Sequence, residues 1–78
     1  MMQGYKVEQL TMLFNRLKEL QGLRWIAYTA PKRPCQLEMA EAYAAHLKRS
    51  GGLGFRIIDV QTGEIVEEWQ NAKKIRPQ

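Results

Sequence analysis

The sequence predicts a small single α+β domain in which two helices pack with a three-stranded sheet, in the order α-β-α-β-β. Two segments, residues 7–20 and 35–49, repeat apolar side chains at the three- and four-residue steps of an amphipathic helix. Three shorter runs, residues 23–29, 55–60 and 64–69, are rich in aromatic and β-branched residues. A chain of 78 residues has room for one core only, so we expect one domain over residues 1–70 and a loose basic tail over 71–78.

The first helix is expected over residues 7–20, and Gly22 is a natural stop just after it. Its apolar stripe consists of Val7, Leu10, Leu13, Phe14, Leu17 and Leu20.

The next run, L-R-W-I-A-Y-T, is too short for a helix and ends at a proline, which favours a strand over residues 23–29. Proline is well suited to the first turn of a helix, and a second helix is therefore expected from Pro34 or Cys35 through Arg49. Its apolar residues Leu37, Ala40, Ala44 and Leu47 recur at helical spacing.

The last two strands, residues 55–60 and 64–69, are separated by Q-T-G, which suits a short hairpin. A β-α-β connection makes the first and second strands parallel with a right-handed crossover, and the hairpin makes the third strand antiparallel. Two strand orders follow. We favour the split β-α-β order 1-3-2, with order 1-2-3 as the alternative.

Composition limits the kind of protein. With 45% hydrophobic and 26% charged residues, the chain has the balance of a globular protein rather than of a disordered one. A single cysteine and a single histidine offer no disulfide and no metal-ligand cluster. The N-terminus lacks the pattern of a signal peptide, and the apolar runs are short. We therefore expect a cytoplasmic protein without metal, cofactor or membrane span.

Both faces of the expected sheet carry apolar side chains, because successive strand residues point to opposite faces. If the first helix lies on the same face as the second, one face stays open and marks an interaction surface; if it lies on the other face, the sheet is covered on both sides. In the first case the partner-binding residues are expected to be Ile26, Tyr28, Ile58, Val60, Val66 and Trp69. A protein partner, or a second copy in a homodimer, would dock there.

The expected topology also gathers cations at one edge of the sheet, and the net charge is +4. The anion- or nucleic-acid-binding candidates are Arg24, Lys48, Arg49, Lys73, Lys74 and Arg76. The simpler interpretation, which we prefer, is that the lysine and arginine at the helix end complement its dipole and that the tail keeps the protein soluble. Lys32 and Arg33 are expected at the opposite edge.

No catalytic constellation is predicted. Cys35 near a helix N-terminus and beside two cations could be an activated thiol, but His46 lies ~16 Å away along the same helix, so the two cannot form a dyad. A small, half-buried residue is the preferred interpretation of Cys35. We expect a non-enzymatic protein-binding, adaptor or inhibitor module that uses an apolar sheet face or edge with a basic rim. The alternative is an accessory nucleic-acid-binding protein that uses the basic edge.

Overall fold

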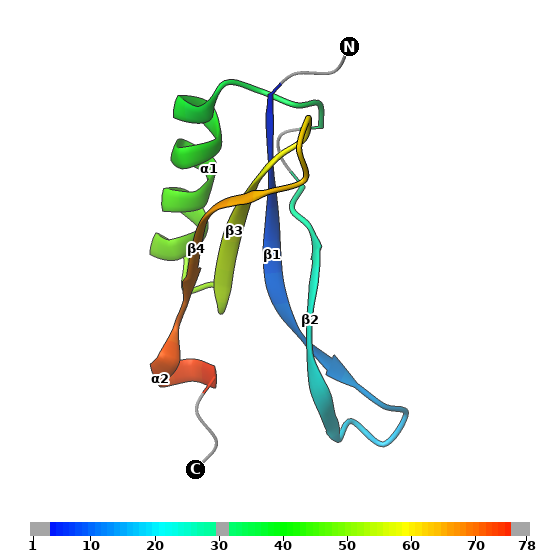
Figure 1. Ribbon diagram of the computed structural model, residues 1–78. Coiled ribbons are helices and arrows are strands. Elements are labelled where there is room, and N and C mark those ends of the chain that lie inside the picture. The colour runs from blue at the N-terminus through cyan, green and yellow to red at the C-terminus, as the bar shows by residue number, and fades with distance from the viewer. Residues whose placement is uncertain (1–3, 30–31, 76–78) are drawn as a thin grey trace.

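The structure, a computed structural model, describes residues 4–29 and 32–75 and consists of a four-stranded antiparallel sheet with one helix packed on it (Figure 1). The elements are β1 (Tyr5–Phe14), β2 (Leu20–Ala27), α1 (Leu37–Arg49), β3 (Gly54–Asp59), β4 (Ile65–Gln70) and the short α2 (Ala72–Ile75). The strand order in the sheet is β2-β1-β3-β4, and every neighbouring pair is antiparallel.

The expected three-stranded sheet with two helices is therefore wrong, because residues 7–20 form no helix. They contain most of β1, a turn and the first residue of β2. The misleading signal is a spacing of three: Val7 and Leu10 share a stripe on a helix but point to opposite faces of a strand. In the structure Val7 pairs with Ile57 on one face and Leu10 pairs with Trp25 on the other, and both Val7 and Leu10 are buried.

Asn15 organises the turn between β1 and β2. Its Oδ1 accepts hydrogen bonds from the backbone N–H groups of Leu17 and Glu19, each at 2.9 Å. Lys18 adopts a positive φ of 62°, and its N–H donates to the Asn15 carbonyl. An asparagine that bonds its own downstream backbone is a common way to reverse a chain, so these contacts close a hairpin where the apolar spacing suggested a helix.

The neighbours of β1 explain the error in strand order. Both β2 and β3 run antiparallel to β1, so they run parallel to one another with α1 as the crossover between them. The strand that separates them is β1 rather than the expected third strand, residues 64–69. That segment forms β4 and lies at the edge beside β3, through the pairs Phe55 with Trp69 and Arg56 with Glu68.

Helix α1 begins at Leu37, after Gln36, and its charges follow the helix dipole. Glu38 lies in the first turn, and His46, Lys48 and Arg49 lie in the last. Ala40, Ala44 and Leu47 form its buried stripe. Since two of these three side chains are alanines, the helix backbone can lie close to the sheet.

The core is small and lies between α1 and the strands β1 and β3. Its buried members are Val7, Ala40, Ala44, Leu47, Phe55 and Ile57. Tyr5, Tyr28, Cys35, Tyr43 and Trp69 are partly buried around it. Leu10 and Ile58 are also buried, but they do not belong to this cluster.

The chain after β4 is held against the loop between α1 and β3. The N–H of Asn71 donates to the carbonyl of Leu53, and the ammonium of Lys74 on α2 donates to the carbonyl of Gly51. The described part of the expected tail thus has defined contacts, while Arg76 lies outside the described residues. Among residues 4–29 and 32–75 no helix has the length and apolar character needed to cross a membrane.

Candidate interaction surface

The β1–β2 hairpin extends beyond the rest of the sheet. The pairing of β1 with β3 ends at Gln9 with Phe55, whereas β1 continues to pair with β2 as far as Phe14 with Leu20. We call residues 11–24, which include the turn, the arm. Figure 1 shows the arm running past the end of β3 at the lower right, away from α1. The molecule is accordingly elongated, with extents of 43 × 24 × 19 Å.

One face of this hairpin is almost wholly apolar. Three cross-strand pairs lie in successive rows on it, and residues paired across strands share a face. We call the set the arm face: Leu10 with Trp25, Met12 with Leu23, and Phe14 with Leu20. Four of its side chains are exposed, Met12 at 38%, Leu23 at 40%, Phe14 at 54% and Leu20 at 55%. Leu17 in the turn, at 78%, is exposed as well.

The arm face points away from α1. Phe55 belongs to the core under α1, and it pairs with Gln9, so Gln9 faces the helix and its neighbour Leu10 faces the opposite side. Helix α1 makes most of its contacts with β1 and β3, on the other side of the sheet, and four of the six arm-face side chains are exposed. Contiguous exposed apolar area of this kind marks an interaction surface.

A row of charged side chains bounds the arm face at its base. Glu8 pairs with Arg56, and Arg56 pairs with Glu68, so the three lie side by side on the face opposite α1. The Arg56 Nε donates to Glu8 Oε1 at 2.6 Å, and the Arg56 guanidinium lies 4.6 Å from the centre of the Trp25 ring. We call Glu8, Arg56 and Glu68 the charged row. Within this row, the Arg56 guanidinium holds the Trp25 ring at the start of the arm face through a cation–π contact.

The edge of the sheet at β2 is a less suitable docking site than the face. Strand β2 is the outermost strand on its side, so its outer backbone groups could in principle accept another strand. Its register with β1 shifts near Leu20 and Gly22, and Arg24 stands in the middle of the strand. Irregular register and a charged residue on an edge strand both oppose strand addition.

The six residues expected to bind a partner do not come together on one face. Ile26 pairs with Gln9 on the α1 side, where Tyr28 and Trp69 also pack against the core. Ile58 pairs with Lys6 on the opposite face and is buried. Val66, in β4, is exposed, and Val60 follows β3, with its N–H bonded to the carbonyl of Gly4.

The cations expected at one edge are partly brought together. Lys48 lies 5.0 Å from the centre of the Trp69 ring, and Lys74 is bonded to Gly51, so the end of α1 and the start of α2 meet beside β4. Arg49 and Lys73 belong to these same helix ends and are exposed. Arg24 instead lies on the arm, opposite Thr11. Contacts within the fold thus engage two of these cations.

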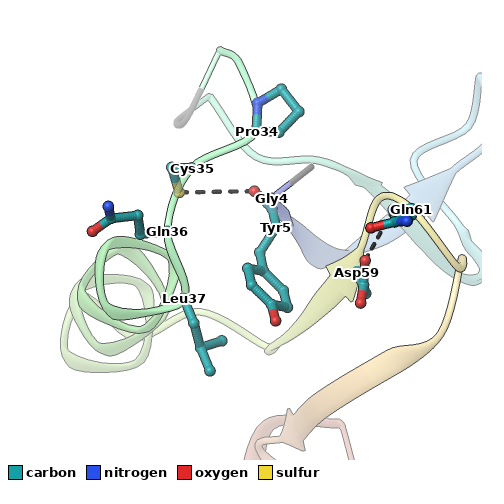
Figure 2. A pocket seen from close by; sticks show the side chains of 8 residues that line it. All are labelled: Gly4, Tyr5, Pro34, Cys35, Gln36, Leu37, Asp59 and Gln61. Carbon is teal, nitrogen blue, oxygen red and sulfur yellow. Dashed lines mark hydrogen bonds between the residues drawn. The ribbon is translucent and has the colours of Figure 1, made fainter. Parts of the chain in front are cut away.

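A second feature is an open pocket of about 630 Å³ at the N-terminal end of α1 (Figure 2). Figure 2 shows Cys35, Gln36 and Leu37 on one side, Asp59 and Gln61 on the other, and Tyr5 between them. The backbones of Tyr5 and Cys35 bond to each other twice, at 2.8 and 3.0 Å, and this bridge ties the loop before α1 to the sheet. The Asp59 carboxylate accepts the N–H of Gln61 in the adjoining turn.

Cys35 is a partly buried residue rather than an activated nucleophile. Its thiol lies 3.7 Å from the carbonyl oxygen of Tyr5, and burial raises the pKa of the thiol above its ordinary value of 9.0. A raised pKa keeps the sulfur protonated near neutral pH, whereas nucleophilic attack requires the thiolate. Helix α1 begins two residues after Cys35, at Leu37. Among the described residues no group of three or more His, Cys, Asp or Glu side chains could hold a metal ion.

None of the six arm-face residues was among the partner-binding residues expected from the sequence. Four of the six lie in residues 7–20, which were assigned to a helix. One signal was available in the sequence. Leu10, Met12 and Phe14 alternate at a spacing of two, and Leu23 and Trp25 repeat that spacing after the turn residues. Read as two strands, this pattern places five large apolar side chains on one face of a hairpin.

Comparisons of the chain with protein-family models, with characterised proteins and with solved structures gave no match. The candidate interaction surface therefore rests on the geometry of this chain alone.

Proposed function

We propose that the protein is a cytoplasmic, non-enzymatic protein-binding module that docks through the arm face. The observation that carries the proposal is the exposure of Met12, Phe14, Leu20 and Leu23 on one side of a protruding hairpin. Burying such side chains against a partner is worth roughly 25 cal/mol per Å² of apolar surface, so a chain in water gains by covering them.

The shape of the arm supports a binding role over a purely structural one. The core residues Ile57 and Phe55 lie under α1. The arm face lies beyond the reach of α1, yet Asn15 and the β1–β2 pairs hold it in a defined shape. A preformed surface loses little conformational entropy when a partner binds.

The alternative function, nucleic-acid binding at the basic end, has weaker support. Lys48 is directed at Trp69 and Lys74 at Gly51, so two of the candidate cations already have partners within the fold. At this end of the described chain Arg49 and Lys73 are the other exposed candidates, and Arg24 lies apart on the arm, so the described residues offer few phosphate contacts for salt-dependent binding.

Site-specific photo-crosslinking tests the proposal. The photoreactive amino acid p-benzoylphenylalanine replaces Leu23 on the arm face in one variant and Glu41, exposed on α1, in the matched control. Both variants are irradiated in an extract of cells that express the protein, before and after nuclease treatment, and the adducts are read by mass spectrometry.

We expect position 23 to give discrete polypeptide adducts, copies of this chain included, that survive nuclease treatment and are absent from position 41. Equal labelling from the two positions, or none from either, would contradict the proposal. Loss of every adduct on nuclease treatment would favour the nucleic-acid alternative.

A further inference from the structure

We propose that the protein binds a small organic phosphate in a second cavity, between the start of β1 and the loop that leads from β2 to α1. We call it the basic cavity. Its volume of about 280 Å³ is near the small end of the range of about 300–1,000 Å³ that is usual for small-molecule sites. It shares no residue with the arm face, and along β1 Glu8 stands between Lys6 of the cavity and Leu10 of the arm face. The inference therefore does not depend on the proposed function.

Cations and apolar side chains line the basic cavity together. The cations are Lys6, from β1, and two residues that we call the loop cations, Lys32 and Arg33. None of the described residues that line the cavity is acidic, and the others are apolar or aromatic, Tyr28 and Val60 among them. This combination fits a ligand that carries an anionic group on an apolar body, since the cations attract the anion and the apolar body leaves water.

The carboxylates near the basic cavity do not cancel its charge. Glu8 Oε2 lies 3.9 Å from the Lys6 ammonium. Lys6 and the charged row together are neutral, because two cations balance two carboxylates. The loop cations add a charge of +2 beside this neutral set, and they form no ion pair with a carboxylate of the described chain. The Asp59 carboxylate belongs to the larger pocket of Figure 2 instead.

The loop that carries the loop cations is tied to β1 at both ends. Before them in the chain, Tyr28 donates its N–H to the carbonyl of Val7 at 3.0 Å. After them, the backbone of Cys35 is bonded twice to that of Tyr5. These bonds place the loop beside β1 before any ligand is present, so the ordering cost of binding is confined mainly to the cationic side chains.

The number of cations favours a phosphate monoester over a carboxylate. Near neutral pH a phosphate monoester carries a charge of about −1.5 to −2 and three acceptor oxygens, enough for Lys6 and both loop cations. The guanidinium of Arg33 can bind two of these oxygens through parallel N–H groups. The volume of about 280 Å³ also suits one aromatic ring with its phosphate, since a cavity of roughly 150 Å³ holds a benzene ring.

Titration of the purified, ¹⁵N-labelled full chain with phenyl phosphate at physiological salt tests the inference through amide chemical shifts. We expect a dissociation constant of roughly 1 mM or below. The largest shifts should occur at the amides of Lys6, Tyr28 and the loop cations. Inorganic phosphate lacks the ring and should bind at least about tenfold more weakly. Benzoate keeps the ring but carries a single charge, and should bind about threefold more weakly.

Three variants separate the basic cavity from the overall positive charge. Lys32→Gln with Arg33→Gln should weaken the binding of phenyl phosphate about tenfold. Arg49→Gln with Lys73→Gln removes the same charge at the opposite end of α1, and should change the affinity less than about twofold. Ala27→Leu fills part of the cavity without a change of charge, and should weaken phenyl phosphate about tenfold while it leaves inorganic phosphate nearly unaffected. All five residues are exposed, so each variant should keep the circular dichroism spectrum of the parent.

Four outcomes overturn the inference. They are the absence of phenyl phosphate binding up to about 10 mM, equal affinity for inorganic phosphate, equal affinity for benzoate, and equal weakening by the two pairs of charge changes. Crosslinking from position 23 decides the proposed function separately, because the basic cavity and the arm face have no residue in common.

Discussion

The two ends of β1 lie in different surroundings, and the end with more apolar residues is the more exposed one. At its start, Val7 is buried between β2 and β3 and beneath α1, with a 3% exposed fraction. At its end, Phe14 pairs only with Leu20 and more than half of its surface is exposed. The start of β1 belongs to what we call the compact region, which consists of α1 and the parts of β1, β3 and β4 that pair with one another. Apolar content alone therefore does not distinguish a core from a docking surface.

The largest effect should come from the compact region. Ile57→Ala removes a side chain with 0% exposure and should lower the free energy of unfolding by about 2–5 kcal/mol, from lost burial and the cavity left behind. Ile65→Ala makes the same change at a side chain that is 48% exposed, and should cost less than about 1 kcal/mol. Urea unfolding followed by circular dichroism, at one protein concentration, checks the pair. Equal losses would mean that the core is not where we place it.

A smaller effect should separate the arm from the compact region. Asn15→Ala removes the acceptor of two backbone N–H groups in the turn and should destabilise the arm locally by about 1–2 kcal/mol. Hydrogen exchange should speed up at amides of the arm while the amide of Ile57 keeps its protection. As a control, Thr62→Ala removes a similar bond, to the N–H of Glu64, and should affect only the β3–β4 turn. Equal acceleration in both regions would show that they unfold as one unit.

Arg56 joins the two regions, and its replacement should have a modest effect. Arg56→Lys keeps the charge but loses the planar guanidinium that contacts both Glu8 and Trp25, and should cost about 1 kcal/mol. Lys6→Arg alters a half-exposed cation that lies 3.9 Å from the same carboxylate, and should leave the stability nearly unchanged. Tryptophan fluorescence, measured in a Trp69→Phe background so that Trp25 alone emits, should report the loss in the Arg56 variant. An unchanged midpoint of unfolding would show that the contacts of Arg56 with Glu8 and Trp25 do not stabilise the fold.

The smallest effect concerns Cys35. Because burial raises its pKa in the folded protein, the folded state holds this proton more tightly than the unfolded state does. The resulting stability is fully present below the unfolded pKa and is lost as the pH rises through the folded pKa. Thiolate absorbance should therefore titrate at higher pH in the folded chain than in urea. Subtracting the pH profile of Cys35→Ser from that of the parent isolates the contribution, and a lowered folded pKa would contradict it.

How far the sequence could predict this fold depends on whether an element carries its own local signal. The β3–β4 hairpin and α1 were predicted within a few residues, because the Q-T-G turn and the Ala40–Ala44–Leu47 stripe are local patterns. Strand β1 was not, because it is central and has an apolar residue on each face at its base. A strand buried on both sides loses the alternation that identifies it.

The candidate site was missed for the same reason, since four of the six arm-face residues lie in the segment assigned to a helix. The partner-binding role expected of Trp69 and Ile26 depended on a sheet without β1. Once β1 enters the sheet, Trp69 stands opposite Phe55 on the α1 side, and Ile26 stands opposite Gln9. One wrong element thus moved the expected surface from the arm to the middle of the sheet.

The arm face is the surface on which the proposed binding role depends. Photo-crosslinking from position 23, repeated in chains that also carry Met12→Ser and Phe14→Ser, tests this surface directly. We predict that these two changes abolish the polypeptide adducts, whereas Met39→Ser with Val66→Ser, on α1 and β4, leaves them at the level of the parent. Adducts that survive the arm-face changes, or that disappear equally in both variants, would contradict a docking role for the arm face.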